Sequence, residues 1–234
     1  MVLVLVDQIT IRIQYTFDFI FKDRGMPYEL TTSFSDFEAR TEVRKLNYSS
    51  TAIEKARRIK PSLLLREASI IPVHVDKVKF EGKIDCLAFD GQCDIVASIF
   101  YVLTRFEEYN SEKDEHGRFP FESSVLKKHD WIEKAICDRW SKVIIEFIDP
   151  DLYIDVTLAN TLSNKRPKFV PTFDIDNTYA YKYKSGKRKL LSICRDFLTF
   201  DFKRVKERSV TNSGGKDPYD TYDRIDIIAQ EFPE

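Results

Sequence analysis

The chain has 234 residues, a net charge of −1, 43% hydrophobic residues and 13% aromatic residues. This composition is typical of a globular protein and excludes a chain that is disordered along its whole length. The near-zero net charge provides no general attraction to nucleic acid, so we expect no nucleic-acid partner.

Four cysteines occur without a Cys-x-x-Cys spacing, namely Cys86, Cys93, Cys137 and Cys194. This usage predicts reduced, mostly buried thiols in a cytoplasmic protein. The apolar start, residues 1–6, is too short for a membrane span and lacks the basic flank of a signal peptide. We therefore expect a first, buried strand there and no membrane span.

Helix and strand patterns alternate in the next part of the chain. Apolar residues at helical spacing occupy residues 8–24, and a glycine and a proline follow to end that helix. Ser33 or Ser35 can cap a second, short helix. Strands are predicted over residues 28–32, 44–48, 62–65 and 73–80. Strands interleaved with helices predict an α/β fold.

Two stronger helices follow. The first begins after Asp94, its predicted N-cap, and its apolar stripe extends through Tyr109. The second runs from about Trp131 to Ile148. Residues 151–164 fit either a strand or a helix.

A polar stretch that ends in Pro167 predicts a domain boundary, giving domains over residues 1–165 and 166–234. The balance of basic and acidic residues also changes at this boundary. From Lys165 onward the sequence has 15 basic and 11 acidic residues, against 22 basic and 27 acidic residues before it.

An apolar run that ends in Asp174 and Asp176 follows this boundary, over residues 169–176. It predicts a buried parallel strand that delivers two carboxylates to its carboxyl end, where α/β folds place their chemistry. The two side chains would point to the same side of the strand. They could share a divalent cation, or act as a base and a metal ligand. The alternative is a loop with two solvated acids, one of which caps the next helix.

The segment after these acids is aromatic and basic. Tyr179 and Tyr181 could stack on sugar rings while neighbouring lysines attract anions. A solvated loop, or a surface against the upstream domain, is the alternative. A helix is predicted over residues 190–198 and a glycine-bearing loop over residues 211–216. A last helix is predicted with Asp220 as its N-cap.

Three stretches together resemble one known family. Residues 171–176, Pro-Thr-Phe-Asp-Ile-Asp, resemble the first motif of NodB-like polysaccharide deacetylases. Residues 217–222 resemble a segment that follows this motif in a Bacteroidetes-type branch. Residues 98–109, with residues 114–120, resemble the uncharacterised domain that precedes the deacetylase barrel in that branch.

The resemblance implies a distorted (β/α) barrel and the metal-dependent hydrolysis of N-acetyl groups on a cell-surface polysaccharide or its precursor. It implies that Asp174 is the general base and that Asp176 binds a divalent metal, zinc or similar. The N-acetylated carbohydrate would be the partner. A bound cation would polarise the amide and activate its water, and the carboxylate would take the proton.

The family completes its metal site with a downstream His-x-x-x-His pair, and this sequence departs from that pattern. Its histidines, His74, His116 and His129, are all upstream and are not spaced as a pair. From Pro167 the sequence has 68 residues, whereas such a barrel needs on the order of 200. We therefore expect this chain to contain only the first βα units of the barrel and a weak metal site or none. Whether the chain is an enzyme is not decided by the sequence.

Several alternatives remain. The chain could be a non-catalytic binding or assembly module for a glycan or protein. It could be a nuclease-like α/β domain that uses acids from residues 85–94. An incomplete barrel would expose an apolar face, so residues after Pro167 should be covered by the first domain, paired with another chain (the rest of the barrel or a second copy), or poorly ordered.

Overall fold

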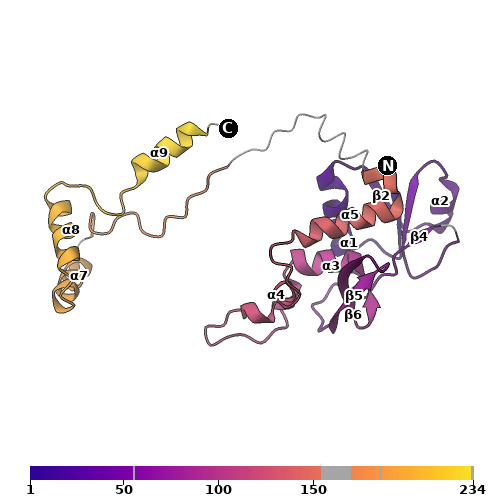
Figure 1. Cartoon of the computed structure of the whole chain (residues 1–234), viewed down its shortest axis with the longest axis horizontal. Coiled ribbons are helices and arrows are strands. Elements are labelled where there is room, and N and C mark those ends of the chain that lie inside the picture. The colour runs from indigo at the N-terminus through magenta and orange to yellow at the C-terminus, as the bar shows by residue number, and fades with distance from the viewer. Residues whose placement is uncertain (55, 154–169, 185, 233–234) are drawn as a thin grey trace. The chain divides into compact units, whose positions relative to one another are not determined.

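The structure is a computed structural model that describes residues 1–54, 56–153, 170–184 and 186–232 (Figure 1). The chain divides into two compact units, Met1–Lys165 (unit 1) and Arg166–Glu234 (unit 2). The segment predicted as strand or helix over residues 151–164 falls largely outside the described residues. Within the described ranges, no helix is both long and apolar enough to cross a membrane.

Unit 1 contains two sheets and the helices that pack on them. The parallel sheet has the strand order β2-β1-β3-β4 and is formed by β1 (Val2–Val6), β2 (Tyr28–Thr31), β3 (Arg44–Tyr48) and β4 (Arg57–Arg58). The antiparallel sheet has the order β5-β6-β7 and is formed by β5 (Val75–Phe80), β6 (Ile84–Phe89) and β7 (Gln92–Cys93). The helices include α1 (Ile11–Ile20), α2 (Phe34–Ala39), α3 (Ile95–Leu103), α4 (Val125–Lys128) and α5 (Ile136–Ile148), with 3-10 turns η1 (Lys22–Arg24), η2 (Phe106–Glu108) and η3 (Phe121–Ser123). This mixed architecture confirms the α/β prediction.

Strand β1 is the centre of the parallel sheet, and all five of its residues are buried. Side chains alternate between the two faces of a strand. Val2, Val4 and Val6 belong to the main core, together with residues of α1, α3 and α5. Leu3 and Leu5 pack on Phe37 of α2 in a smaller cluster. Both faces of β1 are therefore covered, which explains its continuous apolar sequence.

Helix α1 begins at a side-chain cap, and the 3-10 turn η1 that follows it ends at a glycine. The hydroxyl oxygen of Thr10 accepts a hydrogen bond from the Ile13 N–H at 3.1 Å. Phe17 and Ile20 are fully buried against the sheet. Gly25 has a φ of 72°, a left-handed conformation that glycine adopts without steric cost. The predicted helix is confirmed over its central part.

Helices α3 and α5 join the antiparallel sheet to the main core. The hydroxyl of Ser98, on α3, accepts a hydrogen bond from the Leu87 N–H of β6 at 3.0 Å. The Trp140 indole N–H, on α5, donates to the Asp85 carbonyl at 2.8 Å. Both contacts fix a helix to one buried strand, β6.

Three predictions for unit 1 need correction. Residues 62–65 do not form a strand. Leu64 and Leu65 are instead buried in an irregular segment, because an apolar run can fill a core without joining a sheet. The helix after Asp94 ends at Leu103, since Arg105 adopts a φ of 52°, and η2 completes the predicted stretch. The second strong helix begins at Ile136 instead of Trp131.

Unit 2 is helical in its described part, with α7 (Gly186–Leu198), α8 (Phe202–Asn212) and α9 (Tyr222–Glu231). Helix α8 was not predicted. The N-cap prediction for α9 is wrong, because Thr221 occupies the cap position and makes no side-chain cap hydrogen bond. Tyr222, Ile225 and Ile228 form the more covered face of α9, but each is only half-buried.

The buried strand predicted over residues 169–176 is also wrong for its described residues, 170–176, which have no regular secondary structure. Phe169 lies outside the described residues. Val170 is 67% exposed and Phe173 is 42% exposed. A buried strand needs neighbouring strands to pair with, and every strand in the described part of the chain belongs to unit 1.

Candidate functional site

The side chains of Asp174 and Asp176 are exposed on this irregular segment. They are not brought together with a third ligand. Among the residues that the structure describes, no cluster of three or more His, Cys, Asp or Glu side chains could hold a metal ion. The prediction that Asp174 is a base and Asp176 a metal ligand stays untested.

The two tyrosines predicted to contact substrate have different surroundings. Tyr179 packs edge-on against Tyr183, with ring centroids 5.1 Å apart, and also contacts Tyr222. Tyr181 lines a pocket of unit 2, and its hydroxyl donates to a Glu207 carboxylate oxygen at 3.1 Å. Burial and this contact raise the pKa of Tyr181 to about 12. Only the Tyr181 ring is therefore placed beside a cavity.

Asp217 holds the segment that carries Tyr181. Its carboxylate accepts hydrogen bonds from the backbone N–H groups of Ala180, Tyr181, Lys182 and Tyr219, at 2.7 to 3.0 Å. Burial opposes the charged form, but these four donors outweigh it and lower the pKa of Asp217 to about 2. This aspartate fixes the backbone before the hairpin of α7 and α8.

The acids of residues 85–94 do not form a nuclease-like cluster. Asp85 pairs with Lys79 on the sheet surface, at 2.9 Å. Asp94 is fully buried and caps α3 by accepting from the Ala97 N–H, while also accepting from the Tyr48 hydroxyl and the Ser62 N–H. Burial raises the pKa of Asp94, against the opposing effect of these donors. Its role is structural.

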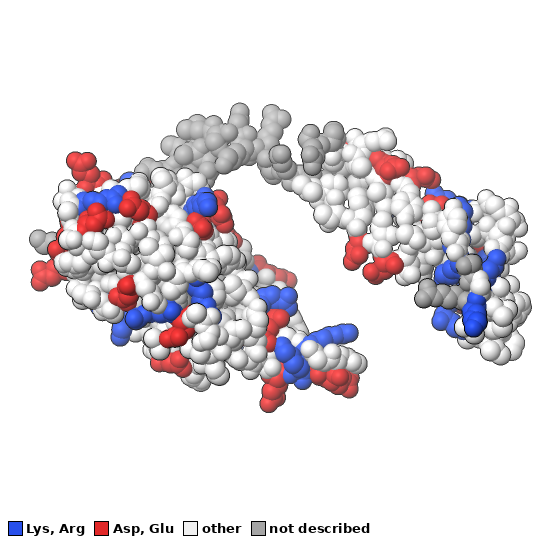
Figure 2. Space-filling model, turned by 180° about the vertical axis from the view of Figure 1, so that it is seen from behind, with Lys and Arg blue, Asp and Glu red and all other residues white. Residues whose placement is uncertain are grey.

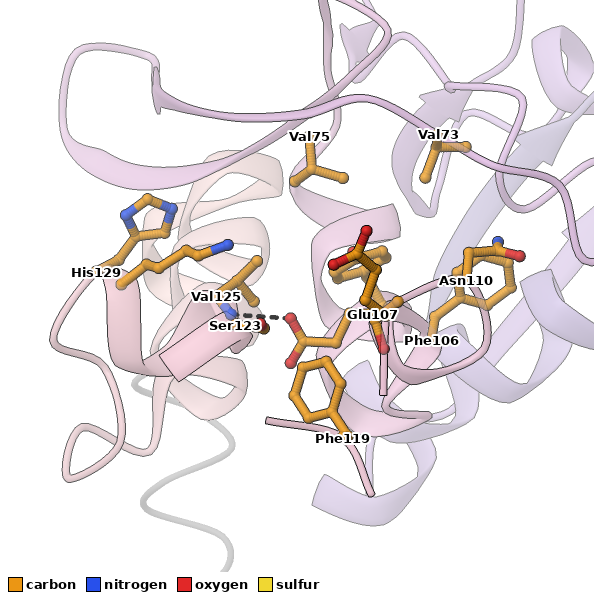
Figure 3. A pocket seen from close by; sticks show the side chains of 13 residues that line it. Val73, Val75, Phe106, Glu107, Asn110, Phe119, Ser123, Val125 and His129 are labelled. Carbon is orange, nitrogen blue, oxygen red and sulfur yellow. Dashed lines mark hydrogen bonds between the residues drawn. The ribbon is translucent and has the colours of Figure 1, made fainter. Parts of the chain in front are cut away.

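Unit 1 contains a pocket of about 430 Å³ that combines rings and polar groups, shown in Figure 3 and here called the aromatic pocket. It lies between the start of β5, the end of α3, η2 and α4. Its lining combines apolar or aromatic side chains with polar ones, as binding pockets commonly do. The lining residues are Val73, Val75, Tyr101, Phe106, Glu107, Asn110, Ser111, Glu112, Phe119, Ser123, Val125, Lys128 and His129.

Glu107 fixes the wall of the aromatic pocket. One carboxylate oxygen accepts from the Ser124 hydroxyl at 2.9 Å, and the other accepts from the Val125 N–H at 2.8 Å (Figure 3). These bonds hold the start of α4 beside η2. Phe106, the residue before Glu107, is buried, and the Arg12 guanidinium lies over its ring, with its carbon 5.3 Å from the ring centroid.

Two ionisable groups of the aromatic pocket are kept neutral. Burial, with a smaller effect of the nearby lysines Lys77 and Lys128, lowers the pKa of His129. Burial, with a smaller effect of Glu107, raises the pKa of Tyr101. A neutral imidazole and a neutral phenol both donate and accept hydrogen bonds, which suits an uncharged, hydroxyl-rich ligand. The other histidines are bound into surface turns: the His116 N–H donates to Asp114, and the His74 ring lies 3.2 Å from Asp76.

Sequence reasoning did not identify the aromatic pocket, because its walls come from four separate segments. A partial signal existed, since Tyr101, Phe106, Glu107 and Phe119 all lie in the stretches 98–109 and 114–120 that were singled out by resemblance. What the spacing could not reveal is that residues 73–75, at and just before the start of β5, close the pocket.

Comparison with known proteins gives a match over residues 2–151 to a family of unknown function (DUF7033). This range covers more than half of the chain and contains the whole aromatic pocket. No curated protein and no solved structure matches the chain. The residues that resemble polysaccharide deacetylases, 171–176 and 217–222, lie outside the matched range. The chain therefore belongs to the DUF7033 family of unknown function.

Proposed function

We propose that this chain is the N-terminal, carbohydrate-recognising part of a polysaccharide-deacetylase-like protein. The complete protein would hydrolyse N-acetyl groups on a cell-surface polysaccharide or its precursor. The observation that carries the recognition role is the aromatic pocket, whose rings and polar groups lie within the family domain. The four thiols, which form no disulfide, support a cytoplasmic location within the same proposal.

The lining of the aromatic pocket suits an N-acetylated sugar. Aromatic rings pack against the C–H face of a sugar, and the half-exposed ring of Phe119 is available for that contact. An N-acetyl group combines a methyl with an amide, so it needs an apolar surface beside donors and acceptors. Val73 and Val75 supply the first, and Ser123 and the neutral His129 supply the second.

Asp174 and Asp176 would contribute the base and one metal ligand of the complete enzyme. Two exposed carboxylates do not by themselves fit a catalytic metal site, which normally has three protein ligands. In the described part of this chain, the two carboxylates therefore lack the further ligands that a catalytic metal needs. Its own contribution would be to bind the polysaccharide and to present these two carboxylates.

Calorimetric titration with a tetrasaccharide of N-acetylglucosamine tests the recognition role. Binding is expected to the N-acetylated sugar and not to the matched glucose tetrasaccharide. Phe119→Ala should weaken binding about fivefold, since a ring contact contributes about 1 kcal/mol. Phe121→Ala, which removes an exposed ring outside the aromatic pocket, should change binding less than about twofold. Equal binding of both sugars, or equal losses in both variants, would refute the role.

A protein-binding or assembly module is the second candidate. It is supported by the exposed apolar side chains of unit 2, including Leu198, Phe200 and Phe202 at 72–79% exposure. Sedimentation velocity would detect self-association, which Phe200→Ser with Phe202→Ser should abolish. Under this candidate, Asp174→Asn with Asp176→Asn leaves association and glycan binding unchanged. If the double substitution abolishes both self-association and glycan binding, this result counts against the protein-binding candidate.

A further inference from the structure

Unit 2 contains a pocket of about 540 Å³ that the proposed function does not use, here called the basic pocket. It is bounded by the hairpin of α7 and α8, by the segment around Tyr181 and by the loop around Tyr219. All its lining residues belong to unit 2, so it is a feature of this unit alone.

The lining of the basic pocket is rich in positive charge. Four basic side chains, Lys184, Arg195, Lys203 and Arg204, face two acidic ones, Asp201 and Glu207. The surrounding sequence has the same bias, because residues 182–208 contain ten Lys or Arg and three Asp or Glu. Figure 2 shows these blue side chains gathered at the α7–α8 end of unit 2.

Part of this charge is available to a ligand. Arg204 lies 3.5 Å from Asp201, and Lys203 lies 4.0 Å from Glu207. Arg195 and Lys184 have no ionic partner among the residues described by the structure, and both side chains are exposed. They therefore give the lining of the basic pocket an excess of two positive charges.

Two lining residues of the basic pocket rest on a buried guanidinium. Arg208 is 7% exposed, donates to the Ser192 hydroxyl at 2.7 Å and pairs with the buried Asp196. The guanidinium carbon lies 4.7 Å from the centroid of the Tyr181 ring. Ser192 and Tyr181 both line the basic pocket, so these contacts hold two of its walls in place.

One donor of this guanidinium is unused. The Nε–H group of Arg208 is buried without a hydrogen-bond partner in the described part of the chain. A buried donor without an acceptor is costly, and such groups often mark a place where a ligand or a water molecule belongs. Arg208 does not itself line the basic pocket, so the chemistry of a ligand is indicated by the lining cations without ionic partners among the described residues, which favour an oxyanion.

We propose that the basic pocket binds a small phosphate ester, such as a sugar phosphate, through Arg195 and Lys184, with the rings of Tyr181 and Tyr219 beside the organic part. Guanidinium groups match the geometry of phosphate oxygens, and an ammonium adds a point charge. A phosphate monoester carries close to two negative charges at neutral pH, which balances the excess charge of the lining. This proposal does not rest on the deacetylase proposal and uses none of its residues.

Calorimetric titration of the whole chain with glucose 1-phosphate, inorganic phosphate, glucuronate and glucose tests the chemistry. Glucose 1-phosphate should bind most tightly, inorganic phosphate more weakly because it lacks the ring, and glucuronate about tenfold more weakly than the ester because it carries one charge. Glucose should not bind. Equal affinity for glucuronate and the ester, or no binding of either phosphate, would overturn the proposal.

Charge-matched double variants locate the site. Lys184→Gln with Arg195→Gln removes the two unpaired cations and should weaken ester binding at least about tenfold. Lys189→Gln with Lys206→Gln removes two exposed charges outside the lining and should change it less than about twofold. Equal losses in both variants would mean that general attraction, not the pocket, binds the anion. Vesicles of anionic phospholipid test a membrane role. If both variants are retained equally on these vesicles and no ester binding is detected, the basic surface binds membranes and the proposal is also refuted.

Discussion

The two units bury different kinds of side chain. In unit 1 the fully buried residues include Trp140, Tyr48 and Phe17, which pack in one continuous apolar core. In the described part of unit 2, the buried residues are all polar or charged, namely Asp196, Arg208, Thr211 and Asp217. Six large apolar residues of the α7–α8 hairpin are 60–79% exposed, namely Leu190, Leu191, Phe197, Leu198, Phe200 and Phe202.

This difference indicates two sources of stability. Unit 1 gains its free energy of folding from apolar area removed from water, at about 25 cal/mol per Å². Unit 2 depends on charge-assisted hydrogen bonds made by a few carboxylates, which are sensitive to protonation. Truncation of apolar side chains should therefore affect unit 1, and loss of single charges should affect unit 2.

The difference between the two units is tested most directly by the same type of substitution, phenylalanine to alanine, made once in each unit. Phe17→Ala removes a ring that is fully buried and should destabilise unit 1 by about 3–5 kcal/mol. Phe200→Ala removes a ring that is 76% exposed and should change stability by less than about 0.5 kcal/mol. Urea denaturation followed by tryptophan fluorescence measures the effect of Phe17→Ala, because Trp131 and Trp140 both lie in unit 1, and amide hydrogen exchange over residues 186–212 measures the effect of Phe200→Ala in unit 2. Similar effects of the two substitutions would contradict the division.

In unit 2 we expect the corresponding loss of stability to follow from the removal of a charged side chain. Asp196→Ala leaves the Arg208 guanidinium buried without its carboxylate and should destabilise the α7–α8 hairpin by about 3 kcal/mol. Amide hydrogen exchange over residues 186–212 measures this loss. Asp196→Leu with Arg208→Met removes both charges and should recover most of the protection. If the double variant is as unprotected as the single one, burial of an unpaired charge is not the cause.

Unit 1 also contains a buried carboxylate, and its removal should destabilise the protein less than the removal of Asp196. Asp94→Ala removes the N-cap of α3 and leaves the Tyr48 hydroxyl and the Ser62 N–H without an acceptor, at a cost of about 2–3 kcal/mol. Asp94→Asn retains a capping oxygen and should cost less. Asp76→Ala, at an exposed position on β5, is the control that should leave the urea midpoint nearly unchanged.

The smallest expected effect is a pH dependence confined to unit 2. Because the pKa of Asp217 is lowered to about 2 in the folded state, its charge stabilises the fold above the unfolded pKa of about 4. That contribution, about 2 kcal/mol, is lost as pH falls from about 4 to about 2. Hydrogen exchange of the amides of residues 180–182 should rise through this window beyond its intrinsic pH dependence. Asp217→Asn should remove the effect.

Local patterns predicted the parts of the fold that depend on local contacts. The apolar run of β1, the helical spacing around Phe17 and the cap at Asp94 were predicted because each feature is set within a few residues. The strand predicted at 62–65 was wrong because periodicity does not tell a buried loop from a strand. Helix α8 was missed because its buried face consists of Arg208 and Thr211 instead of an apolar stripe.

The site was harder to predict than the fold. The two-aspartate motif predicted a strand from its apolar residues, but a strand requires a pairing partner that a single segment cannot specify. Both pockets are made of residues from distant segments, such as Val73 and His129, or Tyr181 and Arg204. Only the tertiary structure brings such residues together, so spacing along the chain could indicate their chemistry but not their assembly.

The position of β1 has a practical consequence for anyone who edits this protein. Val2–Leu5 pair with β2 on one side and Val2–Val6 pair with β3 on the other, so β1 joins β2 to the rest of the parallel sheet. Trimming the N-terminus by even a few residues would remove that junction and separate Tyr28–Thr31 from Arg44–Tyr48. Residues added before Met1, by contrast, would extend beyond the end of β1 and leave its backbone pairs unchanged.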